Sequence, residues 1–182
     1  AAAAVNWSQL ALIRTQLKQF GQAEELYRRA IEAFQSLPAA AQSPDVLSQY
    51  AFSLKRLGAL LIRSNRLGDA EPRYREALAI EEKLIAADPS DSRLRYNMTF
   101  TLSDLGLIAK RRKQFPQAAE AFSRAAAIRG EFASADPKDV RALAGAANVQ
   151  CHLTGVYAAL ARFPEARRAA AACIAFRERL SQ

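Results

Sequence analysis

A long internal repeat is the feature that most constrains this chain. The stretch AFSLKRLG, which begins at Ala51, returns as TFTLSDLG from Thr99, and the flanking positions match as well. Aligning the chain with itself gives four copies, offset by 47, 48 and 48 residues, over residues 4–41, 43–87, 90–135 and 138–182. Such a period predicts four similar supersecondary units, each burying its apolar surface against its neighbours.

Composition and spacing indicate that each unit is a pair of helices. Ala, Leu, Glu, Arg and Gln dominate, and no alternating run of β-branched residues predicts a strand. Small and large apolar residues recur at helical spacing, which lets two helices approach and interlock. The matched sets are Leu10, Leu57, Leu105 and Leu153; Phe20, Leu67, Phe115 and Phe163; Ala23, Ala70, Ala118 and Ala166; and Ala30, Ala77, Ala125 and Cys173. We therefore predict an all-α chain of four hairpins and eight helices.

Helix breakers place the boundaries of these helices. Gly21, the NRLGD stretch at 65–69, Pro116 and Pro164 predict a tight turn within each unit. The stretches SPDV, DPSD and DPKD, starting at 43, 88 and 136, predict the connections between units. We expect the first helix of each hairpin at about 5–18, 45–65, 91–113 and 139–161, with lengths of roughly 21 residues or ~31 Å in the longer cases.

The repeated residues resemble the tetratricopeptide (TPR) pattern, in which a Trp-x-x-Leu-Gly helix packs on a helix carrying Ala-x-x-x-Phe/Tyr and a further Ala. The matching residues are Trp7, Leu10, Ala23, Tyr27 and Ala30; Leu54, Leu57, Gly58, Ala70, Tyr74 and Ala77; and Leu102, Leu105, Gly106, Ala118, Phe122 and Ala125. The fourth unit departs from the pattern at Gln150, Thr154 and Ala170. A terminal repeat often departs in this way.

The period departs from the family as well, because the ordinary TPR unit has about 34 residues. Both helices of each hairpin are therefore expected to be about two turns longer. Such long-helix units resemble arrays found behind kinase or other signalling domains in bacterial regulatory proteins. The resemblance implies a right-handed α-α superhelix forming a single domain over 1–182, a fragment of a larger protein, that serves as a protein–protein interaction scaffold.

The positive charge is concentrated on the four expected first helices. They hold twelve of the 26 Lys and Arg residues and four of the 18 Asp and Glu residues, so the whole net charge of +8 falls within them. In the family that the chain resembles, first helices line the concave groove. We therefore expect a basic groove that binds a protein or peptide segment of acidic character.

The candidate groove residues lie on the first helices, opposite the Leu/Gly packing stripe. They are Phe52, Lys55, Arg63, Phe100, Ser103, Lys110, Arg111 and Asn148. Two structural readings stay open: Phe52 and Phe100 could pack between neighbouring units, and Lys110 to Lys113 could be a solvated helix end, where cations suit the helix dipole. The Lys/Asn constellation by which some TPR domains clamp a terminal carboxylate is not matched, since Ser8, Leu12, Arg56, Phe100 and Asp104 occupy those places.

Other function classes have less support from the residues. His152 is the only histidine, no phosphate-binding or zinc motif occurs, and we expect no enzyme, cofactor or metal site. Nucleic-acid binding, suggested by a pI of about 9.9, lacks aromatic residues interleaved with the basic ones. Self-association through the ARRAAAACIAF surface of the fourth unit, from Ala166, stays open as a third alternative.

The compartment is constrained only in part. No apolar stretch approaches the roughly 18 to 20 residues that span a bilayer, so we expect no membrane segment. Cys151 and Cys173 are expected to be reduced thiols in a cytoplasmic protein, although the two lie on adjacent helices and a bridge is geometrically conceivable. The Ala-rich start without Met is compatible with a removed signal peptide as well as with a domain excised from a longer chain.

Overall fold

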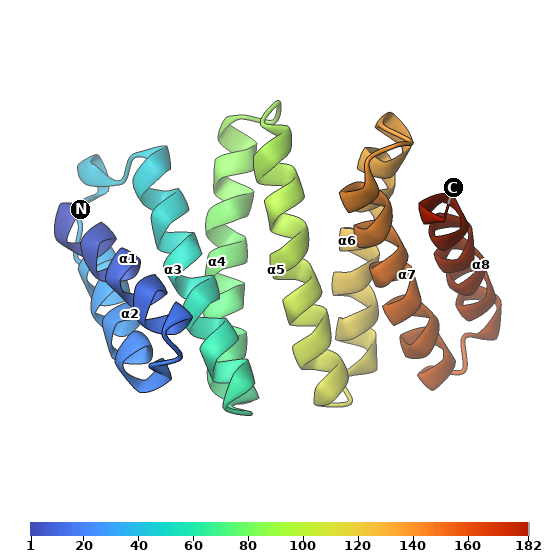
Figure 1. The fold of residues 1–182 in the computed structure, drawn as a ribbon, viewed down its shortest axis with the longest axis horizontal. Coiled ribbons are helices and arrows are strands. Elements are labelled where there is room, and N and C mark those ends of the chain that lie inside the picture. Colours follow the sequence, from blue (N-terminus) through green and yellow to red (C-terminus); the bar gives the residue numbers. More distant parts are fainter. Residues whose placement is uncertain (182) are drawn as a thin grey trace. The chain divides into compact units, whose positions relative to one another are not determined.

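The computed structural model describes residues 1–181, which form eight α-helices, one short 3₁₀ helix and no strand (Figure 1). The all-α prediction and the eight helices are confirmed. The helices divide into two compact units of two hairpins each, Ala1–Asp91 and Ser92–Gln182. In chain order the elements are α1 (Ala2–Gln16), α2 (Phe20–Gln35), η1 (Ala39–Ala41), α3 (Pro44–Arg63), α4 (Leu67–Ala87), α5 (Ser92–Arg111), α6 (Phe115–Ala135), α7 (Val140–Ala159) and α8 (Phe163–Leu180).

The tight turn inside each hairpin depends on one residue in the left-handed backbone region. These residues are Lys18, Asn65, Lys113 and Ala161, with φ between 56° and 59°, and they occupy the same position of the repeat. The next N–H bonds back to a carbonyl five residues earlier, for example from Gln114 to Ala109 at 2.8 Å, which is the Schellman ending of a helix. Gly21 and Gly68, which the sequence suggested as turn residues, lie instead in the first turn of the following helix.

The connections between hairpins cap the helices that follow them. Ser43 accepts a hydrogen bond from the Val46 N–H, and Pro44 occupies the first turn of α3. Asp139 accepts from the N–H groups of Arg141 and Ala142 at the start of α7. These caps satisfy N–H groups that have no partner within the helix.

Close packing within the hairpins explains the repeated Gly and aromatic residues. Tyr74 and Phe122 are buried beneath Gly58 and Gly106, and a Cβ on either glycine would lie 2.5–2.8 Å from ring carbons. The glycines are therefore required so that the two helices of a hairpin can approach closely. The first helices α3, α5 and α7 have 20 residues each and α1 has 15, close to the expected lengths. Leu10, expected in the packing stripe, is 40% exposed on α1.

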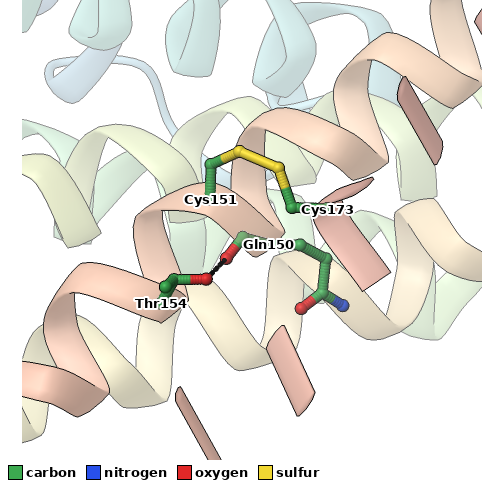
Figure 2. Close-up of a disulfide and its surroundings, with 4 residues drawn as sticks. All are labelled: Gln150, Cys151, Thr154 and Cys173. Atoms are coloured by element: carbon green, nitrogen blue, oxygen red, sulfur yellow. Dashed lines mark hydrogen bonds between the residues drawn. A yellow bond between two sulfur atoms is a disulfide. The ribbon is translucent and has the colours of Figure 1, made fainter. Parts of the chain in front are cut away.

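The last hairpin is built differently and contains a disulfide. Thr154 stands at the glycine position and Ala170 at the aromatic position, so the small and large residues have changed places. Cys151 on α7 is bonded to Cys173 on α8, with their Cα atoms 5.4 Å apart (Figure 2). The expectation of two reduced thiols is therefore wrong for this structure, because adjacent antiparallel helices bring the two residues within bonding distance. Among residues 1–181, no helix has the length and apolar character needed to cross a membrane.

Candidate functional site

In the first unit, the candidate residues are engaged by neighbours in the same unit. Lys55 Nζ lies 2.6 Å from Oε1 of Glu81, a carboxylate that is 4% exposed. The Arg63 guanidinium lies over the ring of Phe20, 4.1 Å from its centroid. Phe52 is partly buried, and Arg56 lies over its ring at 4.8 Å. A ligand at Lys55 would therefore compete with a carboxylate that the chain itself supplies.

In the second unit, Phe100 is the most prominent of the candidates. Its ring is 49% exposed, is contacted edge-on by Tyr96 at 5.6 Å, and has the guanidinium of Arg129 at 5.0 Å. Ser103, one turn further along α5, donates a hydrogen bond to the Thr99 carbonyl at 2.7 Å. Phe100 therefore presents an aromatic ring that α5 and α6 hold in place but do not cover.

The remaining candidates continue this surface toward the end of α5 and onto α7. Lys110 and Arg111 lie in the last turn of α5, and Lys110 Nζ would be 3.7 Å from a Cβ on Gly155. Asn148 is exposed on α7, at the repeat position that Phe100 occupies on α5. We call the side of α5 and α7 that carries Phe100, Ser103, Lys110, Asn148 and Gly155 the α5/α7 face.

His152 lies beside this face, with its ring stacked on Phe122 at 5.0 Å. Burial lowers the pKa of His152 below its usual 6.5, and the positive charges of Lys110 and Arg129 lower it further. His152 is therefore neutral at pH 7. It is a partly exposed helix residue, and Cys151 beside it is in the disulfide.

Arg129 is a functional candidate that the sequence reasoning missed. It lies on α6, is 5% exposed, and donates hydrogen bonds to Thr99 Oγ1 at 3.0 Å and to the Gly145 carbonyl at 3.1 Å. It thus joins α5 to α7 from beneath the α5/α7 face. The repeat alignment contained a signal for this residue. The equivalent position holds the buried Phe34 in the first repeat and a charged residue in the other three, namely Glu81, Arg129 and Arg177.

The chemistry available on these surfaces is that of binding. Within residues 1–181, no group of His, Cys, Asp and Glu side chains is arranged to hold a metal ion. The face instead combines cations, hydroxyl and amide groups and one exposed ring. These are groups that recognise a charged, partly apolar segment.

Comparisons with known proteins bear on the fold. No protein-family model matches the chain, and no curated protein matches its sequence. Among solved structures, aspartyl phosphate phosphatase F from Bacillus subtilis has a TM-score of 0.69 at 16% identity, over 98% of this chain and 41% of that one. The MamA RS-1 ArsTM double mutant has a TM-score of 0.55 at 17% identity, over 94% of this chain and 74% of that one. The fold is that of TPR-like helical repeats.

A further TPR-like structure is less similar. The nearly identical TPR-like repeats of a kinesin light chain from Podosopora anserina have a TM-score of 0.48 at 15% identity, over 94% of this chain and 93% of that one. The all-α repeat fold expected from the sequence is confirmed, and the chain spans 41% of the length of the phosphatase structure.

Proposed function

We propose that the chain is a non-enzymatic protein-interaction scaffold that binds an acidic segment of a partner protein, without a cofactor, along the α5/α7 face. The observation that supports the proposal most is the half-exposed ring of Phe100 on a face flanked by cations. Exposed aromatic residues that are already held in place are typical anchors of protein interfaces, because they bury a large area at little entropic cost.

The charge of the two helices supports an acidic partner. Helices α5 and α7 together carry five Lys and Arg residues and a single acidic residue, Asp104. An acidic segment would gain favourable electrostatic energy along this face, whereas a basic one would be repelled. The other candidates, Phe52, Lys55 and Arg63 on α3, are proposed to form a binding surface of the first unit by itself.

Charge reversal tests this function. The probe is a fluorescein-labelled peptide of Glu and Ala that is capped at both ends. It is about twelve residues long, which is long enough to contact both α5 and α7. The variant Lys110→Glu/Arg111→Glu should bind it at least about tenfold more weakly, measured by fluorescence anisotropy. The matched control, Arg168→Glu/Arg177→Glu on α8, changes the net charge equally at two exposed residues and should bind within about twofold of the unchanged chain. Equal binding by both variants would remove the α5/α7 face as the site.

We also propose that the chain is the C-terminal regulatory part of a multidomain bacterial signalling protein, as the long-helix repeats suggest. The partner segment would then come from another protein or from a preceding domain. The complete gene tests this proposal: a signalling domain encoded before Ala1 supports it, and an unrelated or absent domain contradicts it.

Self-association through the last hairpin is a second candidate, supported by the surface of α8. Phe163 and Ile174 are 58% and 57% exposed. Beside Phe163 lies a shallow hollow of ≈ 410 Å³, lined by Thr154, Phe163, Ala166, Arg167 and Ala170. A patch that offers both an exposed ring and a hollow can pair with its own copy about a two-fold axis. Light scattering should then show a concentration-dependent dimer that Phe163→Ser abolishes, and a monomer at every concentration would exclude it.

The proposed cytoplasmic location can be tested through the disulfide. Cytoplasmic thiols are kept reduced, whereas bridges persist in exported proteins. Trapping thiols with a maleimide reagent in freshly lysed cells should label both Cys151 and Cys173 if the chain is cytoplasmic. An unlabelled pair would place the chain in an oxidising compartment and support the alternative of a removed signal peptide.

A further inference from the structure

A hollow of ≈ 430 Å³ lies between α6, α7 and α8 of the second unit, and we call it the α6/α8 hollow. The residues that line it include Ser123 and Ala126 of α6, Gln150, Leu153 and Tyr157 of α7, and Ala169 of α8. Helical geometry places Gln150 and Tyr157 on the opposite side of α7 from Asn148 and Gly155 of the α5/α7 face. The α6/α8 hollow is therefore a separate surface, and its size falls in the range of about 300–1,000 Å³ that is usual for small-molecule sites.

The repeat provides a comparison for this hollow within the same chain. The equivalent place in the first unit, between α2, α3 and α4, is smaller at ≈ 290 Å³, and Arg28 and Arg73 are among the residues that line it. In the second unit, Ser123 stands at the position of Arg28 and Ala169 at the position of Arg73. Short residues therefore widen the α6/α8 hollow where long ones occupy its counterpart.

Two residues of α7 in the hollow are polar where the repeat is apolar. Gln150 stands at the position of Leu54, which is 0% exposed, and Tyr157 stands at the position of Leu61, which is 1% exposed. The Tyr157 hydroxyl is hydrogen-bonded to that of Ser123 at 3.0 Å. The side-chain amide of Gln150 lies on a different side of α7 from the disulfide (Figure 2), and it has no hydrogen-bond partner among residues 1–181. Packing gains nothing from such an exchange, which indicates a role in binding.

In the first unit, an arginine at the edge of this place binds two carboxylates. Arg66 donates through Nε to Asp69 on its own helix at 2.9 Å, and through Nη1 to Glu24 of α2 at 2.8 Å. Glu24 also accepts from Arg28, again at 2.8 Å. The Glu24 carboxylate therefore joins the second helices of two successive hairpins.

The second unit keeps the arginine but lacks the carboxylate from the preceding hairpin. Arg162, at the position of Arg66, donates through Nε and Nη2 to Glu165 on its own helix. Its guanidinium lies over the ring of Tyr157, 4.8 Å from the centroid, and its side chain is 51% exposed. The position of Glu24 is occupied by Ala119. Among residues 1–181, no acid replaces Glu24 at Nη1 of Arg162, which solvent can reach.

We propose that the α6/α8 hollow binds a small aromatic carboxylic acid that carries a hydroxyl group. Its carboxylate takes the place of the Glu24 carboxylate and accepts a hydrogen bond from Arg162, since guanidinium and carboxylate groups form strong charge-assisted bonds. Its ring packs on Ala126 and Ala169, and its hydroxyl bonds to the free amide of Gln150. This inference goes beyond the proposed function, because it uses none of the residues of the α5/α7 face.

The length of the site suits a single ring with polar groups at its two ends. Two turns of α7, or about 10 Å, separate Gln150 from Tyr157, over which the guanidinium of Arg162 lies. A ring with a carboxymethyl group opposite a hydroxyl group covers this distance together with its hydrogen bonds. The probe is therefore 4-hydroxyphenylacetate.

NMR titration of the unaltered chain with this probe tests the assignment without depending on how a variant folds. The side-chain amide resonance of Gln150 and the Nε–H resonance of Arg162 should shift as 4-hydroxyphenylacetate is added. Phenylacetate, which lacks the hydroxyl, and 4-hydroxyphenylethanol, which lacks the carboxylate, should each bind at least about fivefold more weakly. If neither resonance shifts, or if all three compounds bind equally, the inference is overturned.

Variants that restore residues of the other repeats give a second test. Ala119→Glu returns the carboxylate of the first repeat, which should pair with Arg162 and weaken binding of 4-hydroxyphenylacetate at least about tenfold. Arg177→Gln lowers the net charge by the same amount at an exposed position of α8, and should bind within about twofold of the unaltered chain. Ala119→Glu binding as tightly as this control would overturn the inference.

Gln150→Leu separates binding from packing, because it restores the residue that the second and third repeats carry at this position. It should weaken binding about fivefold and leave the free energy of unfolding unchanged or higher. If Gln150→Leu binds the probe normally, or if it destabilises the chain, Gln150 has a packing role and the inference is overturned. Neither result affects the binding of the Glu/Ala peptide, which tests the proposed function separately.

Discussion

At the scale of single residues, two glycines determine how closely the helices of the middle hairpins approach. Gly58 faces Tyr74 and Gly106 faces Phe122, and both rings are buried. Any side chain at these positions would overlap a ring that packing holds in place. These glycines are thus structural, whereas Phe100, on the same helix as Gly106, is half exposed.

Replacing Gly106 with Ala should therefore destabilise the chain. The new Cβ would lie 2.7 Å from a carbon of Phe122, and overpacking of this kind costs about 1–3 kcal/mol. Gly130→Ala on α6 is the matched control, since nothing lies within 4 Å of its Cβ and Ala should stabilise the helix by about 0.5–1 kcal/mol. Urea denaturation measures both. A Gly106→Ala variant as stable as Gly130→Ala would contradict this packing.

His152 should make the stability depend on pH. Its pKa is lowered in the folded chain by burial and by Lys110 and Arg129, while in the unfolded chain it keeps a value near 6.5. The unfolded state therefore binds the proton more readily, so stability is constant above about pH 7 and falls as the pH drops below 6.5 toward the folded pKa. Denaturation curves between about pH 7 and pH 5 should show this loss, and His152→Gln should abolish it. If the His152→Gln variant loses the same stability between pH 7 and pH 5, titration of groups other than His152 causes the loss.

At the scale of elements, the last hairpin has a covalent bond in addition to its helix packing. It lacks the aromatic residue that the middle hairpins bury beneath glycine, because Ala170 and Thr154 occupy those positions. In its place the Cys151–Cys173 bridge joins α7 to α8, on a different side of α7 from the Gln150 side chain (Figure 2). The disulfide thus holds together the hairpin that has the weakest match to the repeat.

Removing the bridge should lower the stability of this hairpin. The variant Cys151→Ser/Cys173→Ala introduces the residues that the third repeat has at these positions, Ser103 and Ala125, so its packing should be acceptable. The bridge joins residues 22 apart in sequence, and closing a loop of this size stabilises by about 3 kcal/mol. Guanidinium denaturation with and without a reductant measures the effect. Reductant should destabilise the unaltered chain but not the variant. If reductant leaves the stability of the unaltered chain unchanged, the bridge does not stabilise the hairpin.

The sequence predicted the helices better than the contacts of their side chains. Periodicity and the Pro and Asp signals predicted the number of helices and placed the first helix of each hairpin to within three residues, because apolar spacing and capping are local properties. The left-handed residues Lys18, Lys113 and Ala161 were missed, since nothing in these residue types favours that backbone conformation. The disulfide and the Lys55–Glu81 pair were not predicted either, because each depends on which side chains meet between two helices.

At the scale of the whole molecule, the positive charge follows the repeat, because it is concentrated on one helix of each hairpin. The excess of Lys and Arg lies on the first helix of the hairpins, but in the first unit Glu81 already pairs with Lys55. In the second unit, the buried Arg129 donates hydrogen bonds to Thr99 and Gly145, and the half-exposed ring of Phe100 lies 5.0 Å from its guanidinium. The net charge alone therefore does not describe the surface, because it does not distinguish a cation paired with a carboxylate from one bonded to neutral groups.

The central claim is that an acidic segment binds along the α5/α7 face. Chemical-shift mapping of all backbone amides during titration with the Glu/Ala peptide tests it most directly, since it reports on every helix in one experiment. The account predicts the largest shifts on α5 and α7, around Phe100, Ser103 and Asn148, and small shifts on α6 and α8. Shifts concentrated on α8 or on the exposed side of α6, or no shifts at all, would contradict it.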